Sequence, residues 1–126
     1  AALRDAGVVA MLLPGAMTYL KDAAPDLGRR QVASGVTIGV ATDANPGSSP
    51  TNNLALMATL AVTQMGLTAE EALRGITRGA AQALRRPELG TLQPGAGGRF
   101  VVLEAEDSRA LVASFGEPIV RHHVLT

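Results

Sequence analysis

The amino-acid sequence predicts an α/β protein built on a parallel sheet. Residues 8–13 form a continuous apolar run between Gly7 and Pro14, as expected of a strand buried on both faces, and residues 36–41 form a second run that is again apolar and β-branched. The residues between them are numerous enough for the helix-bearing crossover that joins neighbouring parallel strands. Aromatic residues make up only 2% of the chain, and its many small side chains suit close packing of helices on strands.

Two helices are expected in the first half of the chain. Pro25 and Asp26 can begin a short helix that ends at Gly35, because proline and aspartate favour the start of a helix and glycine its end. Residues 54–65 are apolar nearly all round, which predicts a second helix that is enclosed by protein rather than exposed to water. Gly66 is expected to end it.

A capping box predicts the start of a third helix. Thr68 can cap the amide of Glu71, and the Glu71 carboxylate can reach back to the amide of Thr68. Apolar residues recur along one stripe of the following segment, which ends before Pro87. This helix is therefore expected to bury one face only.

The sequence changes in character from Gly90. Turns rich in glycine and proline separate short apolar runs, a pattern typical of antiparallel β-structure. We therefore expect two units in the chain, residues 1–88 and residues 89–126. The apolar runs of the second unit are residues 100–103, 118–120 and 124–125.

Composition and charge exclude several classes of partner. Eleven basic and eleven acidic side chains cancel, and like charges adjoin only in pairs, so neither nucleic acid nor an anionic membrane is an expected partner. The chain has no cysteine and hence no disulfide or thiolate ligand, which fits a reducing compartment. Asp5 and Gly7 interrupt the N-terminal apolar run, and no apolar stretch reaches the roughly 20 residues that span a bilayer. We expect a soluble, cytoplasmic protein that acts on a small molecule.

The densest group of polar residues follows the second predicted strand, in residues 41–50. Binding sites of parallel sheets gather at the carboxyl ends of the strands, so Asp43 is expected at the mouth of the sheet. A carboxylate there can hold a divalent ion or accept a proton from a bound water. The alternative is that Asp43 only caps a turn.

The residues after Asp43 have two interpretations. Asn45 carries both a hydrogen-bond donor and an acceptor, and Gly47 allows the backbone to approach a ligand closely, which together suit a cradle for an anion or an amide. Asn-Pro-Gly is also a strong turn signal, and the same residues can form a plain structural turn.

Five segments together resemble one enzyme family in their order and spacing. The most specific part is the pair Leu-Leu-Pro-Gly, at residues 12–15, and Thr-Asp-x-Asn-Pro-Gly, at residues 42–47. Over nearly its whole length the chain is similar to the imidazolonepropionase family of metal-dependent amidohydrolases. The segments that carry the resemblance are residues 9–16, 41–50, 67–73, 77–81 and 90–95.

The resemblance implies a fold and a set of site residues. The chain would be the C-terminal part of a (β/α)8 TIM-like barrel, with strands seven and eight and the helices that follow them, and then part of a small β-sandwich. Asp43 would be the catalytic, metal-binding aspartate after the eighth strand. Asn45, Gly47 and Ser48 would bind the substrate. Ser48 replaces a threonine expected at this position and keeps the hydroxyl.

The family reaction is the hydrolysis of a cyclic amide. By resemblance, 4-imidazolone-5-propanoate and water would give N-formimino-L-glutamate, a step of histidine degradation, with one divalent metal ion, zinc or iron, in the complete enzyme. The complete enzyme would also be a homodimer. Two other interpretations stay open: another amidohydrolase, such as a deaminase or a different ring-opening hydrolase, and a non-catalytic, stand-alone α/β module.

The histidine content limits what this chain can do alone. The family's metal-binding histidines lie on earlier strands, beginning with a His-x-His pair, whereas this chain has only the adjacent His122 and His123. Adjacent side chains of a strand point to opposite faces, so we expect a partly exposed strand pair rather than two ligands of one ion. A barrel also needs about 250 residues, far more than this chain has. We therefore predict that the isolated chain is inactive.

Overall fold

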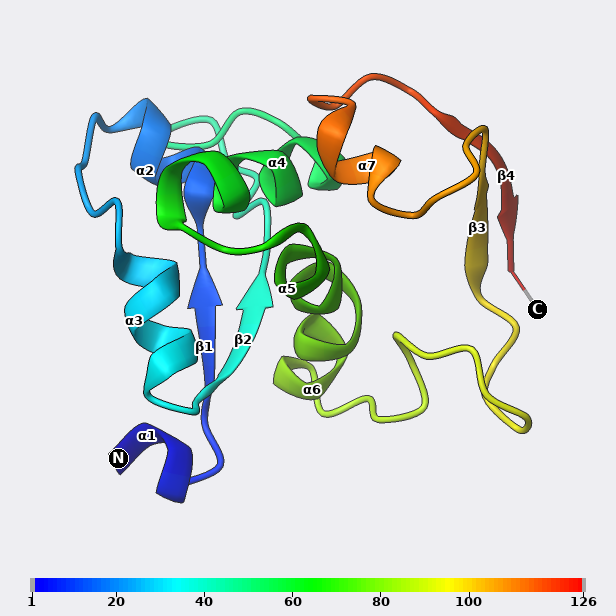
Figure 1. The fold of residues 1–126 in the computed structure, drawn as a ribbon, viewed down its shortest axis with the longest axis horizontal. Coiled ribbons are helices and arrows are strands. Elements are labelled where there is room, and N and C mark those ends of the chain that lie inside the picture. The colour runs from blue at the N-terminus through cyan, green and yellow to red at the C-terminus, as the bar shows by residue number, and fades with distance from the viewer. Residues whose placement is uncertain (1, 126) are drawn as a thin grey trace.

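A pair of parallel strands lies at the centre of the computed structural model. The structure describes residues 2–125, so Ala1 and Thr126, the outer ends of the two expected units, lie outside the described residues. The strands are β1 (Val9–Leu12) and β2 (Thr37–Val40), side by side in Figure 1 and in register along their whole length. The predicted parallel pair is confirmed, and each strand is one residue shorter at both ends than expected. A single helical turn, α1 (Ala2–Asp5), precedes β1 and is not predicted by the sequence pattern.

Burial of the two strands is uneven. Leu12 and Val40 are buried, whereas Met11 is 38% exposed. Burial on both faces is therefore a wrong expectation for β1 in this chain. Within the described residues the sheet has two strands only, so one edge of β1 has no neighbouring strand, and the packed helices leave Met11 partly uncovered.

The connection between the strands contains two helices rather than the one predicted. α3 (Leu27–Ala33) lies where Pro25 and Asp26 indicate a helix, and Gly35 follows it with a φ of 73°. α2 (Pro14–Tyr19) is not predicted, because a Pro-Gly pair after an apolar run indicates only the end of a strand. Proline also fits the first turn of a helix, where an N–H group would have no partner within the helix.

The apolar helix α4 (Leu54–Met65) has the bounds that its sequence predicts. The Asn53 side chain caps it by accepting a hydrogen bond from the Leu56 amide at 2.9 Å, and Gly66 ends it in a left-handed conformation. Its middle is enclosed as predicted, while its first residue, Leu54, is 37% exposed. The core cluster consists of Leu12, Val40, Met57, Ala58, Leu60, Ala61, Met65, Leu67, Ala72 and Val112.

A continuous helical segment follows α4 and packs against β2. Its predicted capping box is present: the Thr68 hydroxyl accepts from the Glu71 amide at 3.2 Å, and the Glu71 carboxylate accepts from the Thr68 amide at 2.8 Å. The segment ends at Ala83, before Pro87 as predicted. In order, it consists of α5 (Ala69–Arg74), the π-helical turn η1 (Gly75–Gly79) and α6 (Ala80–Ala83).

The π-helical turn lies where the helical segment touches β2. A Cβ atom added to Gly79 would stand 1.9 Å from the carbonyl oxygen of Ile38, and one added to Gly75 would stand 2.7 Å from the Val40 side chain. Only glycine allows this separation, because any side chain at position 79 would overlap the backbone of the strand. The turn is not predicted, since an apolar stripe does not report how closely a helix approaches a strand.

The last part of the chain contains an antiparallel pair, β3 (Phe100–Leu103) and β4 (Val120–Val124). The expected antiparallel β-structure is confirmed. The second strand, however, runs on through Arg121, His122 and His123, which interrupt its apolar pattern in the sequence. Both histidines are exposed on β4, as predicted.

An unpredicted helical turn, α7 (Ala110–Ala113), joins the two β-strands and packs against α4. The Thr59 hydroxyl donates to the Val112 carbonyl, and the Asn53 side-chain amide donates to the Gly116 carbonyl at 2.8 Å. Figure 1 shows α7 between α4 and the β3–β4 pair. The connection between β3 and β4 is thus anchored to the α/β part of the chain.

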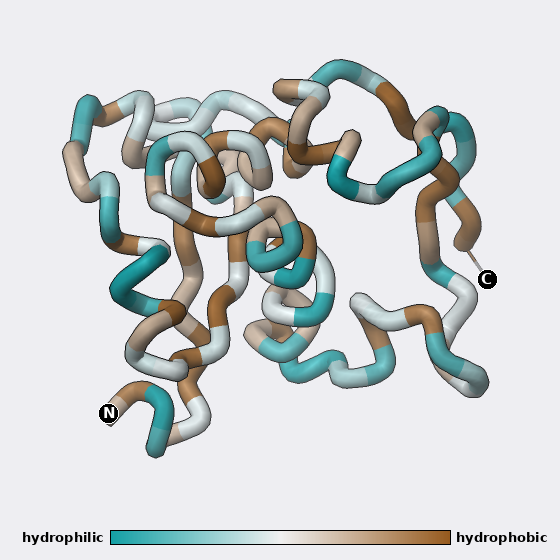
Figure 2. Tube along the Cα trace, in the orientation of Figure 1, coloured by the Kyte–Doolittle hydropathy of each residue, from teal (hydrophilic) through white to brown (hydrophobic). Residues whose placement is uncertain are grey.

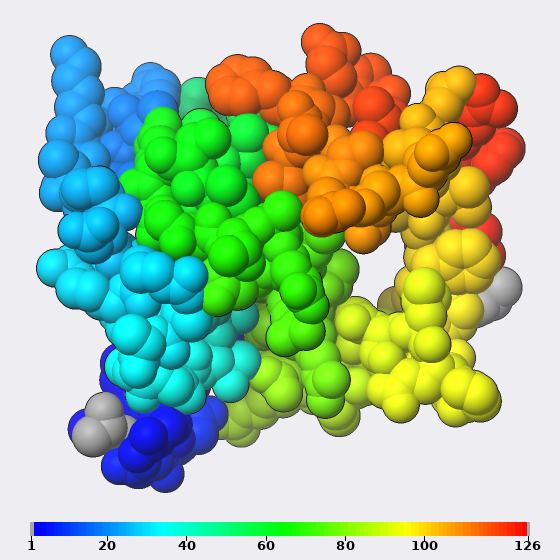
Figure 3. Space-filling view, viewed as in Figure 1, coloured from blue at the N-terminus to red at the C-terminus, as the bar shows by residue number. Residues whose placement is uncertain are grey.

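The β3–β4 pair stands apart from the parallel strands. Phe100, Val101 and Val102 of β3 are 40%, 43% and 40% exposed. A cavity of about 410 Å³ lies between β3 and the helical segment, and Figure 3 shows an opening on this side of the molecule. Figure 2 shows apolar residues along β1, β2 and β3. Met11 of β1 and the three residues of β3 are exposed, so both sheets carry apolar surface.

No helix among residues 2–125 combines the length and the apolar character needed to cross a membrane. Even the apolar helix α4 has 12 residues, against the roughly 20 that a span requires.

Substitution of Gly79 tests the close contact between the helical segment and β2. Gly79→Ala is expected to destabilise the chain by about 3 kcal/mol, because the new methyl group overlaps the Ile38 carbonyl and the helix must move outward. Gly97→Ala is the matched control, since nothing lies within 4 Å of a Cβ atom there. Urea unfolding followed by circular dichroism measures both, and an unchanged midpoint for Gly79→Ala would contradict the contact.

Candidate functional site

The candidate site lies at the edge formed by the carboxyl ends of β1 and β2. The Ala41 amide donates to the Leu12 carbonyl at 3.1 Å, which extends the pairing of the strands to this edge. After it, β1 leads directly into α2, and β2 leads into a loop of residues 41–53. The sequence-based expectation that the two strand ends lie together is confirmed.

Asp43 stands at the start of this loop, exposed to solvent. Its φ is 48°, in the left-handed region that few residues other than glycine adopt and that aspartate tolerates better than most. The amide hydrogens of the following turn bond to Asn45 rather than to Asp43. The role of capping this turn therefore belongs to Asn45, and the Asp43 carboxylate is left facing solvent.

Asn45 organises the turn. Its Oδ1 accepts from the backbone amides of Gly47 and Ser48, both at 2.9 Å. Its Nδ2 donates to the Asp43 carbonyl at 2.6 Å and to Ser48 Oγ at 3.0 Å, and Ser48 Oγ donates back to Oδ1 at 3.3 Å. An asparagine side chain has two N–H groups and two lone pairs, so the four shorter bonds already use its full capacity. The turn that Asn-Pro-Gly favours is thus confirmed, and substrate contact by the same residues stays a prediction.

Gly47 and Ser48 lie on the outer part of the same turn. Gly47 is exposed, and a Cβ atom built on it would have the Asn45 Oδ1 as its nearest neighbour, at 3.4 Å. Ser48 is half-buried beside Asn45. The structure therefore brings Asp43, Asn45, Gly47 and Ser48 into one short loop. A shallow cavity of about 350 Å³ adjoins it, lined by Ala44, Asn45, Pro46, Pro50, Thr51 and Asn52.

Ser49 is a residue of this loop that the sequence does not single out. It is 1% exposed, and its hydroxyl donates to the Thr42 carbonyl at 2.6 Å. Buried polar groups are usually hydrogen-bonded, so the bond itself is expected once burial is known. The sequence offers no signal that separates Ser49 from its neighbour Ser48, since both precede Pro50 in a polar run.

The donor atoms of the described chain do not form a metal site by themselves. Among residues 2–125, no group of three His, Cys, Asp or Glu side chains is close enough to share an ion. Asp43 offers one carboxylate, whereas catalytic zinc sites use about three protein ligands. His122 and His123 lie on β4, outside the loop that holds Asp43. Asp43 therefore suits one ligand of an ion that needs further ligands from elsewhere.

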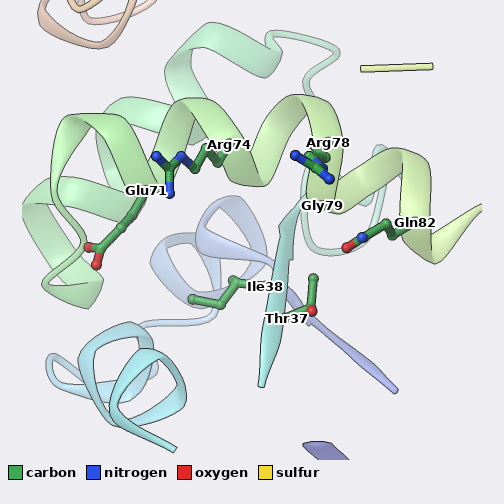
Figure 4. Close-up of a pocket in the computed structure, with 7 residues that line it drawn as sticks. All are labelled: Thr37, Ile38, Glu71, Arg74, Arg78, Gly79 and Gln82. Carbon is green, nitrogen blue, oxygen red and sulfur yellow. The ribbon is translucent and has the colours of Figure 1, made fainter. Parts of the chain in front are cut away.

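A third cavity, of about 190 Å³, lies near the start of β2 and is shown in Figure 4, lined by Arg74 and Arg78 of the helical segment and by Thr37 of β2. Its one carboxylate, Glu71, accepts two hydrogen bonds from Arg29 at 2.7 and 3.2 Å. This ion pair holds the pKa of Glu71 below its usual range. Both oxygens of the Glu71 carboxylate are thus bonded, to Arg29 and to the Thr68 amide, and the group serves the ion pair and the capping box.

Solved structures resemble the fold closely. E. coli guanine deaminase matches with a TM-score of 0.78 and 18% identity, over 98% of this chain and 34% of that protein, a likeness of fold alone. A mutant atrazine chlorohydrolase from Arthrobacter aurescens, solved in complex with zinc and atraton, matches with a TM-score of 0.73 and 26% identity, over 86% of this chain and 28% of that protein.

Sequence comparison identifies the family. The model of the amidohydrolase family matches residues 1–122, and the chain belongs to this family. Among curated proteins, the imidazolonepropionase of Solibacter usitatus is 40% identical over 117 residues, which cover 92% of this chain and 28% of that enzyme. The chain thus spans less than a third of the length of such relatives.

Substitution of Asn45 tests its role in the turn. Asn45→Ala is expected to raise hydrogen exchange at the amides of Gly47 and Ser48 about fivefold, because both lose an acceptor and a hydrogen bond contributes roughly 1 kcal/mol. Asn52→Ala, in the same loop but exposed, is the control. Exchange measured by NMR that is equal in the two variants would show that Asn45 does not organise the turn.

Proposed function

We propose that the chain is the C-terminal part of a metal-dependent cyclic amidohydrolase that converts 4-imidazolone-5-propanoate and water into N-formimino-L-glutamate, in histidine degradation. The observation that carries the proposal is the identity of about 40% with curated imidazolonepropionases over nearly the whole chain, including the loop of Asp43. The polar loop at the carboxyl edge of the sheet supports it, because this edge is where barrel enzymes keep their catalytic groups.

On this proposal, β1 and β2 are the seventh and eighth strands of a (β/α)8 barrel, and β3 and β4 belong to a small β-sandwich. The two-stranded parallel sheet is consistent with this, since parallel sheets are otherwise found with more strands and both faces covered. The exposed apolar residues Met11, Val101 and Val102 would then face the remainder of the barrel and of the sandwich. The complete enzyme would be a homodimer that acts on this small molecule.

The reaction breaks the amide C–N bond of the ring. The water oxygen bonds to the ring carbonyl carbon, the C–N bond breaks, and a proton passes to the departing nitrogen. Asp43 would accept a proton from the attacking water and return it to this nitrogen. One divalent ion, zinc or iron, would be held in part by Asp43; when bound, such an ion lowers the pKa of water and polarises a carbonyl.

The turn after Asp43 would hold the substrate beside this carboxylate. The exposed backbone of Gly47 and the hydroxyl of Ser48 are the groups best placed for contact. The Asn45 side chain already makes five bonds within the loop, so it would contact the substrate by exchanging one of them. Asn45 would thus bind the substrate and also hold Gly47 and Ser48 in position.

A chimeric protein tests the proposal. In this protein, the present chain replaces the segment of the Solibacter usitatus imidazolonepropionase that it matches. We call the result the joined protein. It is expected to bind about one equivalent of metal and to hydrolyse 4-imidazolone-5-propanoate, while the isolated chain shows no turnover because it supplies only one of the roughly three protein ligands needed. Metal analysis and chromatography of N-formimino-L-glutamate measure these outcomes.

In the same experiment, Asp43→Asn should abolish turnover by the joined protein, and removal of the metal by a chelator should do the same until zinc or iron is restored. Turnover by the metal-loaded isolated chain would contradict the dependence on further ligands. Deamination of a heterocyclic amine, without hydrolysis of the imidazolone, would favour the alternative of another amidohydrolase.

Gly47 offers a test of substrate contact that spares the fold. Gly47→Ala is expected to raise KM of the joined protein about tenfold or more, because a methyl group at this exposed position blocks a ligand, whereas its nearest protein neighbour is 3.4 Å away. The melting temperature should not change. Gly97→Ala, in open space far along the chain, is the control. An unchanged KM would remove Gly47 from the substrate site.

A further inference from the structure

Ser49 ties together both ends of the loop that carries Asp43. Its hydroxyl donates to the Thr42 carbonyl, at the start of the loop. Its backbone pairs with Asn45 in both directions, at 3.0 and 3.2 Å, and its carbonyl also accepts from the Thr51 amide at 2.8 Å. One buried residue therefore holds the backbone before the turn, within it and after it.

The Ser49 hydroxyl acts on the peptide group that joins Thr42 to Asp43. A peptide group is planar and rigid, so a carbonyl held in one direction fixes the whole plane, including the amide of Asp43. The direction of the Asp43 Cβ relative to β2 then depends on one further angle, its φ of 48°. A residue other than glycine keeps such an angle only when its surroundings hold it there. Ser49 thus governs the direction of Asp43 without touching its carboxylate.

The Ser49 hydroxyl lies against the first turn of helix α2. A Cβ atom added to Gly15, in the first turn of α2, would stand 2.6 Å from Ser49 Oγ and 2.8 Å from the Met57 sulfur. The absence of a side chain at Gly15 leaves the room that Ser49 occupies. Ser49 therefore links the backbone before Asp43, which follows β2, to the first turn of α2, which follows β1.

We propose that Ser49 is a positioning residue for Asp43. Its hydroxyl, seated against Gly15 and bonded to the Thr42 carbonyl, sets the direction in which the Asp43 carboxylate meets the metal ion and the attacking water. The part played by Asp43 rests on the proposed function. The local effect of Ser49 on the backbone rests on the described contacts alone, and the two are tested separately.

The local effect is measured on the 126-residue chain by NMR. Ser49→Ala is expected to shift the carbonyl carbon of Thr42 and the Cα of Asp43 and to speed hydrogen exchange at the Asn45 amide. Thr59→Val is the matched control, because it also removes a buried hydroxyl that donates to a backbone carbonyl, but far along α4. It should leave these signals unchanged. Unchanged signals in Ser49→Ala, or equal changes in both variants, would overturn the proposal.

The effect on function is measured on the joined protein. Ser49→Ala is expected to weaken metal binding about 10- to 100-fold, as is usual when a group that orients a ligand is lost, and to lower kcat while KM stays within about twofold. Ser49→Cys, which keeps a weak donor of similar shape, should fall between Ser49→Ala and the unmodified protein. Thr59→Val should change neither quantity.

The outcomes separate the two ideas. If the unmodified joined protein binds no metal and shows no turnover, the proposed function fails, and the NMR signals still decide the local role of Ser49. If the joined protein is active and Ser49→Ala retains its metal affinity and kcat, the positioning role is overturned. If Ser49→Ala and Ser49→Cys both unfold the chain, Ser49 serves general stability and the positioning role is likewise overturned.

Discussion

The parallel pairing of β1 and β2 is the constraint on which the rest of the structure depends. Two parallel neighbours require a crossover, which α2 and α3 provide, and this crossover brings the carboxyl ends of both strands to one edge. The loop of Asp43 then lies against the first turn of α2, where Ser49 meets Gly15. The same pairing fixes the surface that α4 and the helical segment cover, and the core forms between them. If the strands separated, the core and the candidate site would be lost together.

Sequence signals that act over short distances predicted much of the fold. The apolar runs indicated both parallel strands, and α4 has the bounds that residues 54–65 suggested. The capping box at Thr68 was equally reliable, because its two partners are three residues apart. Each of these features depends on residues that are close in the chain, and a pattern within a short window contains all the information that is needed.

The features that escaped prediction depend on contacts between distant residues. α7 is held by α4 through Thr59 and Val112, which are 53 positions apart in the chain. The π-helical turn coincides with the approach of Gly79 to Ile38, and no periodic pattern reports such an approach. α2 escaped for a different reason, because its opening Pro-Gly pair has two equally common uses, as a stop after a strand and as the first turn of a helix.

The candidate site shows the same division. The position of Asp43 and its polar neighbours follows from the order of strand and loop, and the structure places Asp43 directly before the turn that holds the other three expected residues. The roles of the individual residues could not be predicted from the sequence. The Asn45 side chain uses its whole hydrogen-bonding capacity inside the loop, and only burial distinguishes Ser49 from Ser48. The donors and acceptors of a segment predict that it can bind a polar ligand. Which residue contacts the ligand and which holds the loop in shape is set by three-dimensional packing.

The anchoring of Asn53 limits how this loop can change in evolution. Asn53 caps α4 and also bonds to the Gly116 carbonyl, while Ser49 is bound to the end of β2, so only three residues lie between two fixed points. Thr51 is hydrogen-bonded to both Ser49 and Asn53, so an inserted residue between them would break one of these bonds. The exposed turn that contains Gly47 is closed at its base by the Asn45–Ser49 pairing, but its outer residues Pro46 and Gly47 lie exposed. Lineages that acquire new substrates would therefore vary the sequence and length of that turn and conserve the spacing from Ser49 to Asn53.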